Sequence, residues 1–425
     1  MRFVAPSAVS GRLRAPASKS HAVRAVLAAA LAGGESSLRH LSRCDDSLAS
    51  LRVARAMGAD VEVGEGEVRV LGGRPPRDLL WDCGESGLLL RASCALAALH
   101  GREVVVTGRG SLLRRPADMV VGPLLSLGAS CGASGRYPPV RVKGPLKGGK
   151  ARVEGGESSQ ALTGLLLALP LCEGDSVLTV ADLKSKPYVA MTLQVLEAFG
   201  GRVARAEDYA RFEISGGQRY RPAEVEAEGD WSGAAFLLVA GAVAGEIAVE
   251  GLDPQSAQAD SGVLQALGAC GARVAWDAGA LSVCSAPLRA FEMDARECPD
   301  LFPPLAVLAC ACEGRSVLRG AERLRHKESD RAEALQTELN NLGADIAVRG
   351  DLMFVEGRRL RGGAVDPRGD HRIAMAAAVA ALCSTDGVRI GSESCVAKSY
   401  PRFFEDLESV RVKAFGPLSA RSTCP

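Results

Sequence analysis

Polar and apolar positions repeat along the chain with a period of 68 to 75 residues. In each repeat, an amphipathic stretch with helical spacing is closed by a glycine. These glycines are Gly58, Gly128, Gly200, Gly268 and Gly343. Because glycine readily adopts the left-handed conformation that commonly ends a helix, the pattern predicts an exposed helix ending at each glycine. Strand-like runs follow four of them, at 68–70, 140–142, 212–214 and 353–355.

A second helical segment recurs on the same period and is apolar on nearly every side. Its copies span 18–34, 85–101, 158–174, 230–245, 299–314 and 370–387. A helix that is apolar all round is expected in the interior of a domain. The six copies therefore predict six units, each with one buried helix, one exposed helix and several strands. A stretch at 399–412 fits the spacing of a sixth exposed helix, although it lacks the glycine.

Glycine-rich or proline-bearing segments at 11–17 and 226–230 are the predicted crossings between two lobes. We expect a first lobe at 18–226, a second lobe formed by 1–17 plus 227–412, and a loose C-terminal tail at 413–425. The predicted fold class is α/β (α+β). It has two pseudo-symmetric lobes, each of three repeated β/α units around buried helices, in the manner of an inside-out α/β barrel.

The polar residues of the apolar helices gather at their N-terminal ends. A helix N-terminus presents unpaired N–H groups and a partial positive charge, so it favours anions. Capping alone explains Ser158, Asp230 and Asp370. It does not explain Lys19 and Arg372, because a cation at this end of a helix costs about 0.3–1 kcal/mol. We therefore expect anionic ligands at these helix starts.

Further basic residues follow turn signals. The segment RHKESDR places Lys327 and Arg331 at the start of an exposed helix, and Arg115 and Lys398 each precede another. Taken alone, RHKESDR also fits a solvated helix start capped by Ser329. Because five other helix starts carry ionic side chains, we interpret the segment as part of the same anion-binding set.

Composition narrows the class of protein. Lys plus Arg (51) nearly balances Asp plus Glu (50), which argues against a nucleic-acid binder and requires any anion site to be a local cluster. No signal peptide and no membrane span are predicted. The 13 cysteines are scattered and mostly lie in apolar stretches, including Cys310 and Cys312, so free thiols in a reducing, cytoplasmic location are expected.

One phosphate-binding motif is nearly present. The run GPLKGGKA at 144–151 approaches a Walker A loop, but Ala151 replaces the magnesium-binding hydroxyl and a strand-like run follows it instead of a helix. We therefore expect no nucleotide, no metal and no other cofactor.

Nine short segments occur in an order that resembles the 5-enolpyruvylshikimate-3-phosphate synthase family, from residue 13 to residue 405. They are PASKSHAVR, TGRGSLLRRP, GGESSQ, LKSKPY, EGDWS, PD before a helix, RHKESDR, DHRIAM and AKSYP. The resemblance implies two lobes of three β/α units, with helix N-termini directed at a shared cleft. It also implies a monomeric cytoplasmic transferase of the shikimate pathway, which makes aromatic amino acids.

The implied reaction moves the enolpyruvyl group of phosphoenolpyruvate to the 5-hydroxyl of shikimate 3-phosphate and releases phosphate through a tetrahedral intermediate. The implied shikimate 3-phosphate site consists of Lys19, Ser20, Arg24, Ser158, Ser159, Gln160, Ser185, Tyr188, Asp300 and Lys327. The implied phosphoenolpyruvate site consists of Lys19, Gly87, Arg115, Gln160, Arg331, Arg372 and Lys398. The implied catalytic residues are Lys19, Asp300 and Glu328.

The reaction needs both a general base and a general acid, because the hydroxyl loses a proton while C3 of the enol gains one. Asp300 is the candidate base and Glu328 the candidate acid. The alternative for Asp300 is a helix N-cap behind Pro299. Lobe closure is expected to exclude water from the tetrahedral adduct.

The chain departs from the family pattern at three positions. Glu85 and Leu88 stand where Asn and Thr are usual, and Arg323 stands where some members have Asn. An ionised Glu85 is expected to repel the phosphate of phosphoenolpyruvate unless Arg91 or Arg115 neutralises it.

Two alternatives remain at this point. The related transferase that acts on UDP-N-acetylglucosamine shares the fold, but its catalytic loop carries a cysteine, and the corresponding run RGSLLRRP at 109–116 has none. A non-catalytic anion-binding protein would tolerate the loss of Asp300 or Glu328, and both are present.

Overall fold

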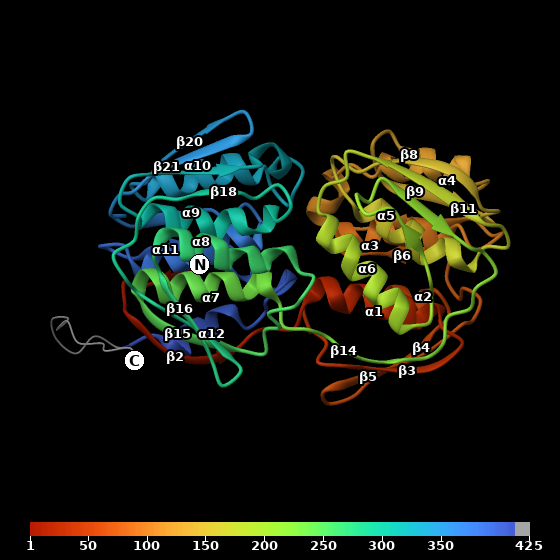
Figure 1. The fold of residues 1–425 in the computed structure, drawn as a ribbon, viewed down its shortest axis with the longest axis horizontal. Coiled ribbons are helices and arrows are strands. Elements are labelled where there is room, and N and C mark those ends of the chain that lie inside the picture. The colour runs from red at the N-terminus through yellow and green to blue at the C-terminus, as the bar shows by residue number, and fades with distance from the viewer. Residues whose placement is uncertain (413–425) are drawn as a thin grey trace. The chain divides into compact units, whose positions relative to one another are not determined.

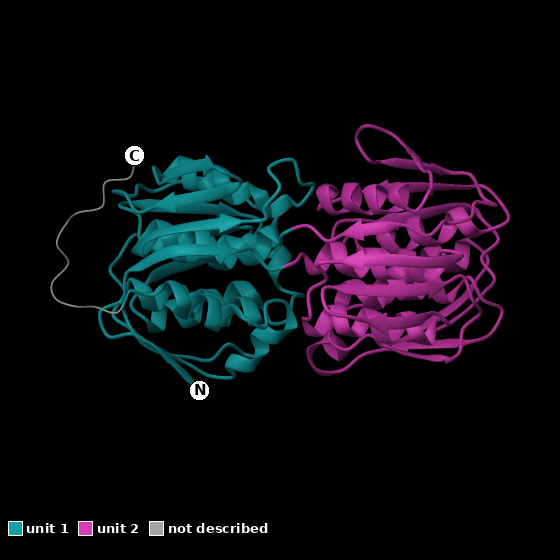
Figure 2. Cartoon of the chain, turned by 90° about the horizontal axis from the view of Figure 1, so that it is seen from below, with its two compact units in different colours: residues 1–16, 229–425 teal, residues 17–228 magenta. Residues whose placement is uncertain are grey.

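The computed structural model describes residues 1–412, in which helices and strands alternate along the chain (Figure 1). The chain forms two compact units (Figure 2): unit 1 comprises Met1–Pro16 with Gly229–Pro425, and unit 2 comprises Ala17–Glu228. The expected tail at 413–425 lies outside the described residues. None of the described helices has the length and apolar character needed to cross a bilayer.

Unit 2 contains three four-stranded sheets. Their orders are β14-β3-β5-β4, β6-β7-β9-β8 and β10-β11-β13-β12. The strands are β3 (Gly34–Arg39), β4 (Asp60–Val63), β5 (Glu67–Gly72), β6 (Leu80–Asp82), β7 (Val104–Thr107), β8 (Ser130–Ser134), β9 (Tyr137–Lys143), β10 (Gly149–Glu154), β11 (Ser176–Ala181), β12 (Ala204–Arg205), β13 (Arg211–Ile214) and β14 (Glu224–Glu226). In each sheet the first pair is parallel and the other pairs are antiparallel.

Unit 1 repeats this design. Its sheets have the orders β16-β17-β15-β2, β18-β19-β21-β20 and β1-β23-β22. The strands are β1 (Arg2–Val4), β2 (Val9–Arg14), β15 (Gly245–Glu250), β16 (Arg273–Asp277), β17 (Ala280–Cys284), β18 (Glu292–Asp294), β19 (Arg315–Arg319), β20 (Asp345–Arg349), β21 (Leu352–Glu356), β22 (Gly363–Val365) and β23 (Val388–Ile390). The parallel pairs are β2 with β15, β18 with β19, and β22 with β23.

Six apolar helices fill the interiors of the two units, as the all-round apolar pattern predicted. They are α1 (Lys19–Leu31), α3 (Gly87–Ala97) and α5 (Gln160–Ala168) in unit 2, and α7 (Trp231–Ala244), α9 (Phe302–Cys310) and α11 (His371–Leu382) in unit 1. Nearly every residue of these helices is buried. Gly164 lets α5 approach α3 closely, because a Cβ there would lie 2.7 Å from the backbone of Ala92. The predicted α/β class is confirmed.

The second set of helices is α2 (Asp45–Ala56), α4 (Val121–Ser126), α6 (Lys186–Ala198), α8 (Val263–Cys270), α10 (Arg331–Asn341) and α12 (Phe403–Val410). Short 3-10 turns lie at Gly110–Arg114, Asp118–Val120, Leu169–Leu171, Ala259–Gly262, Pro299–Leu301, Ala321–Leu324 and Glu393–Lys398. The prediction that an exposed helix ends at a glycine is confirmed at Gly58, Gly128, Gly200 and Gly343, all of which have positive φ.

The prediction that α8 ends at Gly268 is wrong. The helix continues to Cys270, and Gly271 adopts the left-handed conformation with φ of +84°. The Ala272 N–H donates to the Leu267 carbonyl at 2.9 Å and the Gly271 N–H to the Gly268 carbonyl at 3.2 Å. These paired bonds close a helix at a left-handed glycine, so the later of two glycines ends the helix.

The chain exchanges strands where it passes between units. Strand β2 pairs with β15 inside unit 1, although the helix that follows β2 in the sequence belongs to unit 2. Strand β14 pairs with β3 inside unit 2, although the next helix belongs to unit 1. The sequence placed the divisions after residues 17 and 226, whereas Ala17 and 227–228 lie in unit 2. Hydrogen bonds from Ser18 N to Glu228 O and from Ala227 N to Arg39 O hold these residues there.

The twelve cysteines within residues 1–412 are free thiols, and most of them are buried. Cys310 and Cys312 belong to the apolar core of unit 1, as their sequence context predicted.

Candidate functional site

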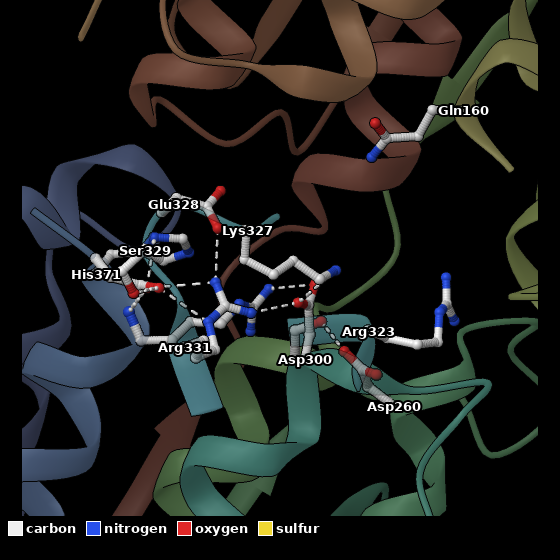
Figure 3. Close-up of polar contacts among 12 residues, drawn as sticks. Gln160, Asp260, Asp300, Arg323, Lys327, Glu328, Ser329, Arg331 and His371 are labelled. Carbon is white, nitrogen blue, oxygen red and sulfur yellow. Dashed lines mark hydrogen bonds and ion pairs between the residues drawn. The ribbon is translucent and has the colours of Figure 1, made fainter. Parts of the chain in front are cut away.

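A cluster of carboxylates and cations occupies unit 1 at the starts of the interior helices (Figure 3). Asp300 lies in the 3-10 turn before α9, and Lys327 and Glu328 lie in the turn before α10. Arg331 is the first residue of α10, and Arg372 lies in the first turn of α11. The structure thus brings together residues that are 72 positions apart in the chain.

Arg331 is the centre of this cluster. Its side chain is fully buried and contacts three carboxylates: Nη1 lies 2.8 Å from Asp300, Nη2 lies 2.7 Å from Glu328 and Nε lies 2.9 Å from Asp370. Burial opposes the charge of Arg331, but Asp370, Glu328 and Asp300 outweigh it and raise its pKa. The guanidinium is therefore permanently charged and fixed in orientation.

Asp300 is surrounded by cations. Arg372 Nη2 lies 3.0 Å from its Oδ2, and Lys327 Nζ lies 3.4 Å from its Oδ1. Burial would raise the pKa of Asp300, but Arg372, Lys327 and Arg331 hold it well below its usual value. Asp300 is therefore ionised at neutral pH. Asp300 does not occupy an N-cap position, because the N-cap of the 3-10 turn is Cys298 and that of α9 is Leu301.

Two lysines complete the cluster. Lys398 Nζ lies 3.4 Å from Glu328 Oε1, opposite the oxygen that faces Arg331. Burial lowers the pKa of Lys327 to about 8, although the neighbouring Asp300 partly opposes this shift. Glu328 is therefore bound by two cations, and Lys327 can lose its charge in mildly alkaline solution.

Asp370 organises the helix starts around the cluster. As the N-cap of α11 it accepts a hydrogen bond from Arg372 N at 2.9 Å. Its other oxygen accepts one from Ser329 Oγ at 3.1 Å. Ser329 is therefore not the cap of α10; that cap is Asp330, whose side chain accepts from Glu333 N. Ser329 and Arg331 of the RHKESDR segment are thus bonded to Asp370 at the start of α11, and Ser329 does not cap a solvated helix start.

Behind Asp300 lies a carboxylate that the sequence did not single out. Asp260 is fully buried and accepts a hydrogen bond from Ser232 Oγ, while Ser232 N donates to the N-cap Asp230. Burial, and then repulsion by Asp300, raise the pKa of Asp260 to about 6. In the sequence Asp260 resembled an ordinary polar residue at a helix start, so nothing distinguished it.

In unit 2, Lys19 begins α1 and forms a 3.1 Å ion pair with Asp46 at the start of α2. Asp46 is buried and was not singled out, because an acidic residue in a first helical turn is common. The ion pair explains how a cation is tolerated at the positive end of α1.

Arg24 is buried in unit 2 and fixed by several acceptors. It donates to Thr192 Oγ1 at 2.9 Å, to the Tyr188 carbonyl at 3.1 Å and to the Ser20 carbonyl at 2.8 Å. Burial lowers its pKa to about 10. Its guanidinium also lies 5.9 Å from the centre of the Tyr188 ring. The sequence predicted Ser20, Arg24 and Tyr188 but missed Thr192, which is a helix-interior residue without a motif.

The start of α5 carries three of the predicted polar residues. The helix begins at Gln160 with Ser159 at the N-cap position, and Ser158 Oγ accepts from Gln160 N at 3.2 Å. Arg91 Nη1 donates to Gln160 Oε1 at 2.5 Å. Ser185, at the N-cap position of α6, is buried and has a left-handed backbone with φ of +56°.

Gly87 begins α3 beside two guanidinium groups. A Cβ at this position would lie 2.8 Å from Arg91 Nη1 and 2.9 Å from Arg115 Nη2. Arg91 is held by the Pro116 carbonyl, which accepts from Nε at 3.1 Å and from Nη2 at 2.5 Å. Glycine is therefore needed at the start of α3 for both arginines to reach it.

Each unit thus presents cations at helix starts, and unit 1 adds two carboxylates able to move protons. Arg323, a departure from the family pattern, donates a hydrogen bond to the Arg296 carbonyl, and its charge helps to lower the pKa of Lys327. Within residues 1–412, no group of three or more His, Cys, Asp and Glu side chains is arranged to hold a metal ion. The arrangement suits the binding of small anions with acid–base chemistry between them.

Comparison with protein families places the chain beside known enzymes. The family model of EPSP synthase (3-phosphoshikimate 1-carboxyvinyltransferase) matches residues 4–407. A 3-phosphoshikimate 1-carboxyvinyltransferase of Methanocorpusculum labreanum is 38% identical over 414 residues, covering 96% of this chain and 98% of the relative. The enzyme of the same name from Aeropyrum pernix is 40% identical over 405 residues, covering 95% and 94%.

Solved structures agree with the sequence relatives. EPSP synthase from Acinetobacter baumannii superposes with a TM-score of 0.81 at 28% identity, covering 96% of this chain and 97% of that one. The enolpyruvyl transferase NikO from Streptomyces tendae has the same fold, with a TM-score of 0.78 at 20% identity and 96% coverage of both chains.

Proposed function

Because the chain belongs to the EPSP synthase (3-phosphoshikimate 1-carboxyvinyltransferase) family, we propose which of its residues carry out the reaction of that family. The enzyme transfers the enolpyruvyl group of phosphoenolpyruvate to the 5-hydroxyl of shikimate 3-phosphate and releases phosphate. The observation that carries the assignment of roles is the position of Asp300, which lies within ion-pair distance of Lys327, Arg331 and Arg372.

Asp300 is the base in the first step. It removes the proton of the 5-hydroxyl as that oxygen forms a bond to C2 of phosphoenolpyruvate. Its cationic neighbours lower its pKa and by themselves make it a weak base. When the phosphate and carboxylate of phosphoenolpyruvate take over Arg331 and Arg372, those charges are neutralised and the affinity of Asp300 for a proton rises.

Glu328 is the acid in the same step. Its cationic partners Arg331 and Lys398 favour the ionised carboxylate, so it takes up a proton when the substrate anions bind these cations in its place. It then donates this proton to C3 of the enol, which leaves a tetrahedral adduct with a methyl group at the former C3. In the second step the ionised Glu328 takes a proton back from that methyl group, the C2–O bond to phosphate breaks, and the enolpyruvyl ether forms. Asp300 gives the hydroxyl proton to the departing phosphate, so both carboxyl groups return to their starting states. One residue performs both transfers because the group that protonates C3 is correctly placed to deprotonate it.

The remaining assigned residues bind the two anions. Ser20, Arg24, Ser158, Ser159, Gln160, Ser185, Tyr188 and Lys327 bind shikimate 3-phosphate. Gly87, Gln160, Arg115, Arg331, Arg372 and Lys398 bind phosphoenolpyruvate, and Lys19 contacts both. Arginine suits this task because its planar group binds a carboxylate or phosphate through two parallel hydrogen bonds.

The assignment of Asp300 and Glu328 also explains why both face cations. Each carboxylate neutralises positive charges that would otherwise repel one another, and the substrate anions replace it as the partner of those cations.

We also propose a monomer in the cytoplasm. Its free thiols are those of a protein in a reducing compartment, and each unit buries its own apolar core. Light scattering after size-exclusion chromatography tests the monomer, and a mass near twice that of the chain would overturn it.

The function is tested by incubating the protein with phosphoenolpyruvate and shikimate 3-phosphate and measuring phosphate release. Release should require both substrates. A parallel reaction with UDP-N-acetylglucosamine in place of shikimate 3-phosphate should give none. No release above background with the first pair would sink the assignment.

A further inference from the structure

Glu85 lies in the turn between β6 and α3, and its carboxylate binds the backbone of a second, distant turn. Its Oε2 accepts a hydrogen bond from Ser111 N at 2.9 Å and another from Ser111 Oγ at 2.6 Å. Within residues 1–412, the hydrogen bonds of Glu85 go to Ser111 and not to Arg91 or Arg115. The neutralisation by an arginine that the sequence suggested is therefore not how this carboxylate is accommodated.

Backbone contacts bring the same two turns together. Arg109 N donates to the Gly84 carbonyl at 2.8 Å, and Cys83 N donates to the Thr107 carbonyl at 2.8 Å. The hydrogen bonds from the Glu85 side chain to Ser111 are the contacts between the two turns that lie farthest from β7. Glu85 therefore holds the part of the second turn that follows β7.

Two glycines in the second turn make room for the contact. A Cβ at Gly110 would lie 2.5 to 2.7 Å from the Glu85 carboxylate, and one at Gly108 would lie 2.5 Å from the Gly84 carbonyl. Gly110 also has φ of +57°, a conformation that other residues rarely adopt. The segment is therefore shaped around a carboxylate at position 85.

The fastened segment leads directly to Arg115. The 3-10 turn Gly110–Arg114 buries Leu112 and ends at Arg115, whose N–H donates to the Leu112 carbonyl at 3.1 Å. Arg115 is itself buried, and its guanidinium lies against the first residue of α3. The position of Arg115 relative to the N-terminus of α3 therefore depends on where residues 109–112 are held.

We propose that Glu85 is a positioning residue for phosphoenolpyruvate: through Ser111 it holds the 109–115 segment so that Arg115 stands at the start of α3. The inference rests on the proposed function, which assigns Arg115 to phosphoenolpyruvate. It differs from the expectation from the sequence alone, in which the charge of Glu85 repels this substrate unless Arg91 or Arg115 neutralises it.

Three variants separate positioning from repulsion. Glu85→Ala should raise KM for phosphoenolpyruvate by about tenfold or more, the usual scale for losing two hydrogen bonds to a charged group. In the same variant, KM for shikimate 3-phosphate and kcat should stay near wild type. Glu85→Gln should keep both KM values and kcat near wild type, because one amide oxygen can accept both hydrogen bonds from Ser111. Ser111→Ala removes one of the two hydrogen bonds, so its KM for phosphoenolpyruvate should lie between those of wild type and Glu85→Ala.

Matched controls are available in the same unit. Glu103→Ala removes an exposed glutamate paired with Arg141, and Ser126→Ala removes an exposed hydroxyl bonded to the Gly122 carbonyl. Both should leave KM for phosphoenolpyruvate unchanged. A lower KM in Glu85→Gln would show that repulsion dominates and would overturn the proposal, as would an unchanged KM in Glu85→Ala.

A second measurement does not depend on activity. Arg109 and Arg114 are exposed, so trypsin cleavage after them, located by mass spectrometry, reports on the mobility of the segment. Cleavage there should be faster in Glu85→Ala than in wild type or Glu85→Gln, and equal rates would overturn the proposal. If wild-type protein released no phosphate, the proposed function would fail while the proteolysis result still decided whether Glu85 holds the segment.

Discussion

Arg331 shows at the scale of a single residue how a buried cation is stabilised by its neighbours. A buried charge is tolerated only when partners replace the water it has lost. Arg331 has such partners in Asp300, Glu328 and Asp370, which together occupy both ends of the guanidinium. The site is consequently organised before substrates arrive, and substrate anions enter a network whose geometry is already set.

Glu328→Gln should bind shikimate 3-phosphate normally and lose turnover by about two orders of magnitude or more, because a positioned proton donor contributes about 10²–10⁴ in rate. Isothermal titration calorimetry measures the binding and phosphate release measures the rate. Glu333→Gln, an exposed position near the same helix start that pairs with Arg368, is the matched control and should behave as wild type. Turnover near wild type in Glu328→Gln would show that Glu328 is structural.

Binding of shikimate 3-phosphate should weaken as the pH rises above about 8. The pKa of Lys327 is lowered to about 8 by burial, so its ammonium is lost in that range, although Asp300 partly opposes the shift. If the ammonium contacts the ligand, Kd should grow by up to about tenfold per pH unit above the pKa. Titration calorimetry between pH 7 and pH 9.5 gives the curve. Lys327→Arg, which stays charged, should give a flat one, and equal slopes for the two proteins would remove Lys327 from the binding site.

Apart from the residues that the family resemblance implied, individual candidate residues could be picked out from the sequence only where they broke a local rule. Lys19 and Arg372 were visible because a cation at a helix N-terminus is unfavourable without a partner. Asp46 and Asp260 were not, because an acidic residue in such a position satisfies the local rule. Their partners lie 27 and 28 residues away along the chain, and no local pattern encodes that proximity.

At the scale of elements, the two glycines near the end of α8 make a matched pair. Gly268 is exposed within the helix and a Cβ there would meet nothing within 4 Å, whereas Gly271 has φ of +84°. Gly268→Ala should raise the free energy of unfolding by about 0.5–1 kcal/mol, because alanine is the better helix former. Gly271→Ala should lower it by about 1–2 kcal/mol, because alanine resists the left-handed conformation.

Urea unfolding followed by circular dichroism measures both changes. Changes of the same sign in the two variants would contradict the assignment of Gly271 as the residue that ends α8. Each variant serves as the control for the other, because both add one methyl group and the two positions are three residues apart at the same end of α8.

Helices were more predictable than their ends. An apolar pattern on every side of 230–245 or 370–387 leaves no exposed face, so α7 and α11 had to lie in an interior. The end of α8 was predicted at the wrong glycine because Gly268 and Gly271 both lie near it. The sequence does not show which of them adopts the left-handed conformation that allows the hydrogen bonds closing the helix. The 3-10 turn at 110–114 has no periodic pattern, and its conformation depends on Glu85 and Ser111.

At the scale of the whole molecule, the residues assigned to shikimate 3-phosphate belong to both units: Asp300 and Lys327 to unit 1, and Lys19, Arg24 and the serines to unit 2. Saturating shikimate 3-phosphate should therefore stabilise both units. A ligand at 100 times its Kd adds about 2.7 kcal/mol to the state that binds it.

Hydrogen exchange with mass spectrometry reads the two units separately, since peptides from 17–228 report on unit 2 alone. The slowest amides of α5 and of α9 should both exchange up to about 100-fold more slowly with the ligand. Inorganic phosphate at the same concentration controls for ionic strength. Protection confined to unit 2 would exclude contacts of Asp300 and Lys327 with this ligand.

The two-unit organisation was largely readable from the sequence, because the repeat has six copies and the breaks in it carry glycine and proline. The predicted divisions after residues 17 and 226 already placed β2 in the second lobe and β14 in the first. What the repeat did not reveal is the exchange of strand partners at the crossings, in which β2 pairs with β15 and β14 pairs with β3.

This exchange has a consequence for biosynthesis. Strand β2 is translated long before its partner β15. At about 5–20 residues per second, the ribosome needs on the order of ten to fifty seconds to synthesise the chain between the two strands. During that wait unit 2, whose residues are contiguous, can be completed, while β2 remains an unpaired edge. Arg12 and Arg14 give the waiting strand charges that discourage association with other nascent chains.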